Sequence, residues 1–206
     1  MKPRDPETWA GLLRSVAMPA LDRLGDPAVY RDDAGDRTRT DAFLLARLGL
    51  TDGPLPEARG PDEALWGLAV SGSGDPSTHV RPRERLFEAD AWSAIEVATE
   101  AELSGLQALS HLATRSPKLW ARCLDAARWN LAELQADNAT NRPWGIGVFF
   151  GLWCWEANAG ALHYAEGQLH AAQIGSGIAA GPDTRSALIL EDAAQWLERF
   201  VPPQAG

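Results

Sequence analysis

Apolar residues recur every three or four positions through the second half of the chain, a spacing that places them on one face of an α-helix. The stripe formed by Leu103, Leu106, Leu109 and Leu112 is one example. No segment keeps the alternation of apolar and polar residues that is typical of a half-buried strand. We therefore predict an all-α protein whose antiparallel helical hairpins pack as a bundle or as a layered α/α array.

Cap and turn residues divide this second half into separate helices. Ser116 followed by Pro117 predicts a helix start, because serine is a favourable N-cap and proline fits the first helical turn. Pro143 predicts another start, and the sequence Asn-Ala-Gly at 158–160 predicts the turn of an antiparallel pair. A last helix is expected from about Thr184 to Phe200.

The first 85 residues are interrupted by stretches rich in proline, glycine and charge. Helices are expected from Pro6 to about Leu24, near Asp41–Leu48 and from Pro61 onward. The segments between them have the composition of loops.

We predict one domain over residues 1–206. It combines a loop-rich part, residues 1–85, with a continuous helical core, residues 86–206. Thr99–Glu102 matches a capping box, which favours a helix start at that point. The same residues also fit the interior of a longer helix, so the pattern leaves open whether residues 86–115 form one helix or two.

The segment 146–155 is apolar on every side of the predicted helix. A helix of this kind belongs in the middle of a protein or in a subunit interface. The sequence therefore predicts a homo-oligomer formed through the apolar C-terminal helices.

The composition, 45% hydrophobic and 23% charged over 206 residues, is that of an ordinary globular protein. A net charge of −9 disfavours nucleic acids and anionic membranes as partners, because both attract clustered Lys and Arg. The N-terminus lacks the apolar core of a signal peptide, and no apolar run reaches the roughly 20 residues of a bilayer span. We expect a cytoplasmic location, with Cys123 and Cys154 as reduced core thiols.

Four titratable residues follow the apolar segment: Glu156, His163, Glu166 and His170. His163 and His170 lie seven residues apart, about 10.5 Å along a helix, which is too far for one metal ion to bind both. We therefore predict neither a metal nor a cofactor. Glu156 and His163 are the candidate catalytic pair, since a carboxyl group at the end of an apolar helix suits a general acid. Glu166 and His170 are candidate ligand-binding residues.

The polar loop before the apolar segment supplies the other candidate ligand-binding residues, Asn141, Arg142 and Trp144. Polar loops on a rigid scaffold often carry binding residues, and an indole face accepts sugars and cations.

A second polar segment, Asp32-Asp33-Ala34-Gly35-Asp36, resembles the aspartate-rich D-D-x-x-D motif of the all-helical isoprenoid synthases. That resemblance implies Mg²⁺ held by carboxylates on a helix. Gly35 and the charged residues around it predict a loop instead.

These patterns favour a non-catalytic helical protein that binds a protein partner or associates with itself. The alternative is an enzyme of the α/α-toroid type, which would act on a carbohydrate-like or other small ligand by carboxylate and histidine acid–base chemistry. The sequence alone does not fix a catalytic set.

Overall fold

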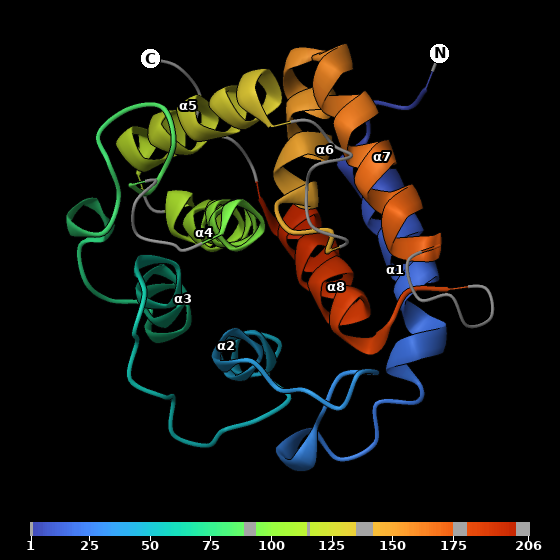
Figure 1. Cartoon of the computed structure of the whole chain (residues 1–206). Coiled ribbons are helices and arrows are strands. Elements are labelled where there is room, and N and C mark those ends of the chain that lie inside the picture. The colour runs from blue at the N-terminus through green and yellow to red at the C-terminus, as the bar shows by residue number, and fades with distance from the viewer. Residues whose placement is uncertain (1, 89–93, 115, 135–141, 175–180, 201–206) are drawn as a thin grey trace.

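The computed structural model describes residues 2–88, 94–114, 116–134, 142–174 and 181–200 (Figure 1). These residues contain no strand, which confirms the predicted all-α class. Two short 3₁₀ helices occur at Pro27–Val29 and Pro76–Thr78. The α-helices are α1 Pro6–Leu21, α2 Arg39–Arg47, α3 Pro61–Ser71, α4 Ile95–Ala113, α5 Pro117–Glu133, α6 Ile146–Glu156, α7 Ala159–Ile174 and α8 Thr184–Arg199.

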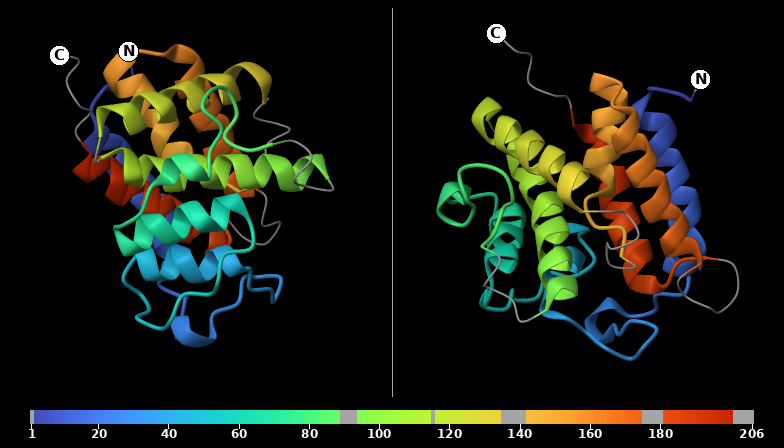
Figure 2. Two further views of the ribbon diagram at one scale, coloured as in Figure 1. Left: turned by 90° about the vertical axis from the view of Figure 1, so that its left-hand side faces the viewer. Right: turned by 45° about the horizontal axis from the view of Figure 1, so that its top comes forward.

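The helices form two groups that meet along α8. In one group α5, α4, α3 and α2 stack one below another, each in contact with the next, as the left view of Figure 2 shows. In the other group α1 lies along α8, and α6 packs against both α7 and α8 (Figures 1 and 2). Helices α2 and α8 also touch. The arrangement is a layered array of helices, as predicted from the sequence.

Several predicted boundaries are confirmed. Ser116 caps α5, where its hydroxyl accepts a hydrogen bond from the backbone N–H of Leu119, and Pro117 is the first residue of that helix. Helix α7 begins at Ala159 after the predicted turn, and Asn158 accepts a hydrogen bond from the backbone N–H of Ala161. Helix α8 spans nearly the predicted range.

One predicted helix start is wrong, and the structure decides between the two possibilities left open for the capping-box match. Pro143 does not open α6, because Gly145 adopts a left-handed conformation (φ 74°) that interrupts the helical backbone, and the helix begins at Ile146. The capping-box match lies inside α4, which already begins at Ile95. Glu102 instead accepts hydrogen bonds from the backbone N–H groups of two residues in the loop before α4, Leu86 and Phe87.

The apolar faces of α6 are covered within one chain. Its residues from Ile146 to Leu152 are all buried, and the ring of Phe150 stacks on Trp9 of α1 with 4.3 Å between ring centroids. The segment before α1 also contributes, since the backbone oxygen of Pro3 accepts hydrogen bonds from the indoles of Trp9 (3.0 Å) and Trp153 (2.7 Å). A subunit interface is therefore not needed to shield this helix from water.

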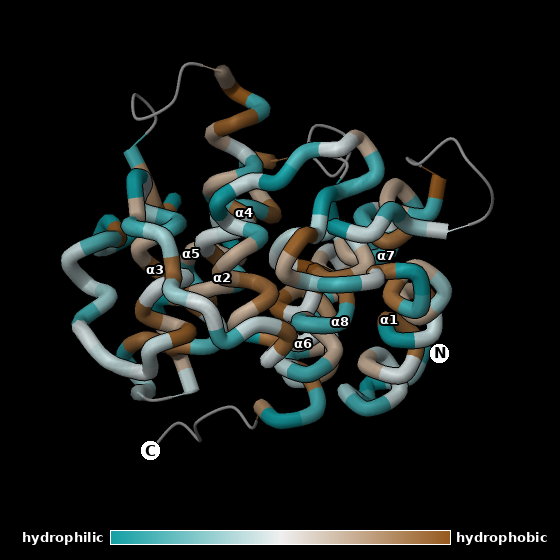
Figure 3. Tube along the Cα trace, turned by 90° about the horizontal axis from the view of Figure 1, so that it is seen from below, coloured by the Kyte–Doolittle hydropathy of each residue, from teal (hydrophilic) through white to brown (hydrophobic). Residues whose placement is uncertain are grey.

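Brown and teal stretches alternate along the helices in Figure 3, as expected for helices with one buried and one exposed side. Cys123 and Cys154 are free and buried, as predicted, and burial raises the pKa of the Cys123 thiol to about 12. None of the described helices is both long and apolar enough to cross a membrane.

A buried cluster of charged side chains joins the two groups of helices. Arg185 of α8 donates to both carboxylate oxygens of Asp41 in α2, at 2.9 and 2.8 Å. A third guanidinium nitrogen lies 3.1 Å from the carboxylate of Asp32. The side chains of all three residues are less than 10% exposed. Such a pair is costly to break, because the remaining charge is left buried without a counter-charge.

We predict that Arg185→Met lowers the free energy of unfolding by about 3–5 kcal/mol, since it leaves the Asp41 carboxylate buried without its cation. Urea denaturation followed by circular dichroism measures this change. The matched control is Arg128→Met, which removes a cation that pairs with Glu156 at the surface and should cost less than about 1 kcal/mol. Equal losses in the two variants would contradict a structural role for the buried cluster.

Candidate functional site

A pocket of about 540 Å³ lies where α2, α3 and α4 converge. The N-terminal ends of α2 and α3 supply Thr38, Thr40 and residues 59–63. Helix α4 supplies Glu100 among others, and Trp144 and Arg185 complete the lining. The volume lies within the range of small-molecule sites.

The sequence positions these residues through helix caps. Thr38 caps α2 in a capping box with Asp41, so the threonine end of that helix faces the pocket while Asp41 reaches Arg185. Gly60 precedes Pro61, the first residue of α3. Because the first turns of both helices lie at the pocket, backbone N–H groups and their partial positive charge concentrate there.

Two of the lining carboxyl groups have fixed partners. Glu63 accepts hydrogen bonds from the backbone N–H of Arg59 (2.8 Å) and from the guanidinium of Arg39 (3.2 Å). Glu100 accepts one from the indole N–H of Trp144 (3.2 Å). These contacts hold both carboxyl groups at the pocket wall.

Asp62 differs from these two carboxyl groups, because within the described residues neither an ion pair nor a hydrogen bond from another side chain holds it. Its side chain is partly buried in the pocket lining. Burial raises the pKa of Asp62 to about 6, and the negative charges of Glu63 and Glu100 add to the effect, whereas backbone N–H groups at the start of α3 oppose it. A carboxyl group with a pKa near neutrality can both donate and accept a proton at physiological pH.

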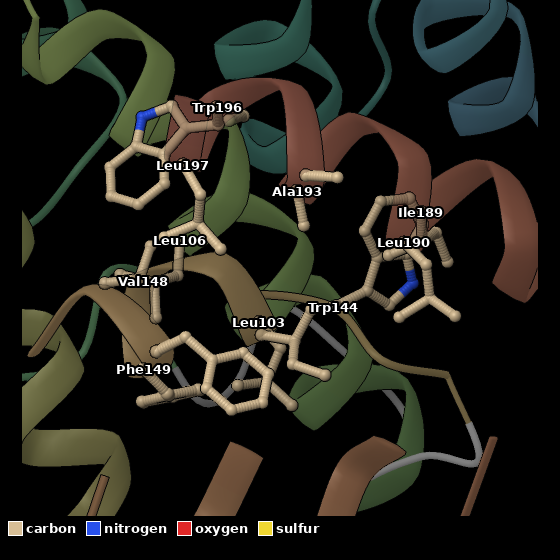
Figure 4. Close-up of a cluster of buried hydrophobic side chains, with 14 of the residues drawn as sticks. Leu103, Leu106, Trp144, Val148, Phe149, Ile189, Leu190, Ala193, Trp196 and Leu197 are labelled. Atoms are coloured by element: carbon tan, nitrogen blue, oxygen red, sulfur yellow. The ribbon is translucent and has the colours of Figure 1, made fainter. Parts of the chain in front are cut away.

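Of the predicted binding residues that the structure describes, Trp144 reaches this pocket. Its indole is 1% exposed and lies in the apolar cluster formed with α4, α6 and α8 (Figure 4). The backbone around it is held from two sides, since Gln168 of α7 donates to the Trp144 carbonyl (2.9 Å) and the next N–H, of Gly145, donates to Gln107 of α4 (3.0 Å). Trp144 therefore contributes to the pocket by donating its indole N–H to Glu100, and not through the indole face as expected from the sequence.

The structure does not place the candidate catalytic pair in this pocket. Glu156 is exposed at the end of α6, where both carboxylate oxygens contact Arg128 at about 3 Å. His163 is exposed on α7.

The remaining candidate ligand-binding residues lie elsewhere. Glu166 pairs with Lys2, and His170 is exposed on α7. Arg142 pairs with Asp183 and lies 3.6 Å from Asp32. Asn141 lies outside the described residues.

The aspartate-rich segment forms a loop that is held by its own carboxylates. Asp32 accepts hydrogen bonds from the backbone N–H groups of Ala34 and Asp36, and its second oxygen faces Arg185. Asp33 accepts hydrogen bonds from Thr184 at the start of α8. These carboxylates are engaged with backbone groups and arginine. In the described part of the chain, no three His, Cys, Asp or Glu side chains cluster closely enough to hold a metal ion.

Comparisons of the chain with protein-family models, with curated proteins and with solved structures gave no match.

Asp62 should make stability depend on pH in an unusual direction. Its pKa is about 6 in the folded protein, above its ordinary value of 3.8, so the folded state binds more protons between pH 4 and 6. The free energy of unfolding therefore falls as the pH rises through this window. We predict that Asp62→Asn stabilises the protein by about 2 kcal/mol at pH 8, a gain that shrinks toward pH 4.

Urea denaturation of both proteins at several pH values measures this difference. Asp75→Asn is the control of opposite sign, because hydrogen bonds from Ser77 lower the pKa of Asp75, so this variant should be less stable than the parent at pH 8. A destabilised Asp62→Asn variant at pH 8 would show that the Asp62 carboxylate supports the fold.

Proposed function

We propose that the protein binds a small hydroxylated, carbohydrate-like ligand in the pocket lined by Asp62, Glu63 and Glu100, which we call the acidic pocket. We further propose that Asp62 exchanges a proton with this ligand. The observation that carries this proposal is Asp62 itself, a partly buried carboxyl group that pairs with no cation of the described chain, placed in a pocket beside Glu100. A partly buried carboxyl group of this kind lowers stability at neutral pH, and such a cost is common at functional sites.

The lining suits a ligand with several hydroxyl groups. Thr38 and Thr40 can donate and accept hydrogen bonds, Glu100 can accept them, and Arg59 can donate them. A hydroxyl group both donates and accepts, so a polyhydroxylated molecule can satisfy this mixed set.

Asp62 and Glu100 would have different roles. Burial raises the pKa of Asp62, and no cation among the described residues holds its charge, so it can deliver a proton to a leaving or bridging oxygen of the ligand. The Glu100 carboxyl group, oriented by the Trp144 indole, can accept a hydrogen bond from a ligand hydroxyl or from a water. The pair provides the elements of acid–base chemistry at an oxygen atom.

Self-association through the C-terminal helices was the first expectation from the sequence. Self-association was expected because it would cover the apolar side chains of α6. A single chain already buries the residues from Ile146 to Leu152. The pocket therefore supplies the stronger argument, because the described fold leaves its polar groups accessible to a ligand.

The indole N–H of Trp144 provides a direct reporter of binding. We predict that its ¹H–¹⁵N NMR resonance shifts when the protein is titrated with a panel of neutral monosaccharides and disaccharides, because its acceptor Glu100 would form a new hydrogen bond to a sugar hydroxyl. The indole of Trp196 is the internal control, since it donates to the backbone of Ser110 in the core and should not move.

Two variants separate binding from proton transfer. Glu100→Gln should reduce the affinity for the best sugar of the panel by about tenfold, the cost of losing a hydrogen bond to a charged group. Asp62→Asn should keep most of the affinity but lower any turnover by about 10²–10⁴-fold. A Trp144 resonance that moves only with cationic ligands such as amino sugars would contradict the proposed ligand class, and one that moves with no ligand would contradict the site.

A further inference from the structure

A second groove, of about 660 Å³, lies between α5 and the loop that precedes α4, on another part of the surface from the acidic pocket. Apolar side chains on both of its sides include Val80 and Leu119. Arg81, Arg83 and Lys118 line the same groove. This concentration of positive charge is unusual in a chain whose net charge is −9 and which has only two lysines.

Two of these cations are available to a ligand. Arg81 lies 3.2 Å from the Glu88 carboxylate, whereas Arg83 and Lys118 are exposed and form no ion pair within the described residues. Asp75 is close enough to feel the charge of Lys118, but its carboxylate accepts hydrogen bonds from Ser77. Many other arginines of the described chain are held in ion pairs, as Arg14, Arg39, Arg128, Arg142 and Arg185 are.

The loop that carries Arg81 and Arg83 is held firmly against α5. Arg122 donates hydrogen bonds to the backbone oxygens of Arg81 (2.7 Å), Glu84 (3.0 Å) and Arg85 (2.8 Å). Asp125, which also lines the groove, adds a fourth hydrogen bond between α5 and the loop, because its carboxylate accepts from the backbone N–H of Glu84 (2.8 Å).

Glu84 adopts a left-handed conformation, φ 59°, which is rare for a residue other than glycine. Backbone of this kind persists only where surrounding contacts determine it, and it is common at ligand-binding loops. The ring of Phe87 fixes the end of the loop, because it packs so closely on Gly105 of α4 that any larger residue there would collide with it. The backbone that carries these cations is thus held in place by contacts with α5 and α4.

We propose that this groove binds a small anionic amphiphile, a carboxylate with an apolar chain. Its carboxylate would lie between Lys118 and Arg83, and its chain would follow the apolar side chains of Val80 and Leu119. The Asp125 carboxylate does not repel such a ligand strongly, because Arg122 lies 3.4 Å from it. The apolar lining contacts the chain of the ligand and the cations contact its carboxylate. A small anion without a chain and a neutral chain without a carboxylate should therefore both bind more weakly than the amphiphile.

Isothermal titration calorimetry with three ligands of equal chain length tests this proposal: octanoate, 1-octanol and octylammonium. Octanoate should bind at least fivefold more tightly than octanol, and octylammonium should bind least. Added salt should weaken octanoate binding but leave octanol binding unchanged. Amide resonances of Lys118, Leu119 and Ala121 should shift with octanoate, which locates the ligand.

The double variant Lys118→Glu/Arg83→Glu should lose octanoate binding by about tenfold or more and should bind octylammonium more tightly than the parent does. The control Arg23→Glu/Arg199→Glu makes the same change of net charge at exposed arginines outside the groove and should keep the affinity for octanoate. Circular dichroism of both variants verifies that they are folded.

Three results would overturn the proposal. Octanoate and octanol could bind equally, which would leave the cations without a role. The control variant could lose as much affinity as the groove variant, which would attribute binding to net charge. A hexaglutamate peptide could bind this groove where octanoate does not, which would assign it to an acidic protein segment.

Discussion

The contact of Arg185 with Asp41 and Asp32 is the constraint on which both the fold and the pocket depend. It is the buried electrostatic link between α8, the helix shared by the two groups, and the N-terminal part of the chain. The same contact orients α2, so that the capping threonine of that helix faces the pocket. Each charge in the cluster is matched, whereas Asp62 in the same pocket has no ion pair among the described residues. The structure thus separates the charges that support the fold from a carboxyl group that no ion pair among the described residues holds.

Much of the fold could be predicted from the sequence, because caps and apolar stripes are local signals. Ser116 and Pro117 start α5 as their chemistry requires. The covering of α6 could not be predicted in this way, since it depends on Trp9 and on the backbone oxygen of Pro3, and the contact of Pro3 with Trp153 joins residues 150 positions apart in the chain. A local pattern shows that a helix needs cover, but it does not tell whether that cover comes from the same chain.

The site was less predictable. Trp144 was selected for its indole face and reaches the pocket through its N–H group instead. Glu156 and His163 lie on exposed positions, because the helices that carry them turn those positions to water. Asp62 gave no signal of its own, since an acidic residue in the first turn of a helix is ordinary. The pKa of Asp62 is raised mainly by burial in the pocket, and the charge of Glu100 on another helix adds to the effect.

The proposed acid–base role of the pocket depends on a carboxyl group, Asp62, that exchanges its proton near neutral pH. A pH titration of the Asp62 side-chain carboxyl by ¹³C NMR, assigned with the Asp62→Asn variant, tests it most directly. The structure predicts a pKa of about 6, caused mainly by burial and increased by Glu63 and Glu100, and a lower value in Glu100→Gln. A pKa near 4 that Glu100→Gln leaves unchanged would contradict the account, because Asp62 would then be an ordinary surface carboxylate.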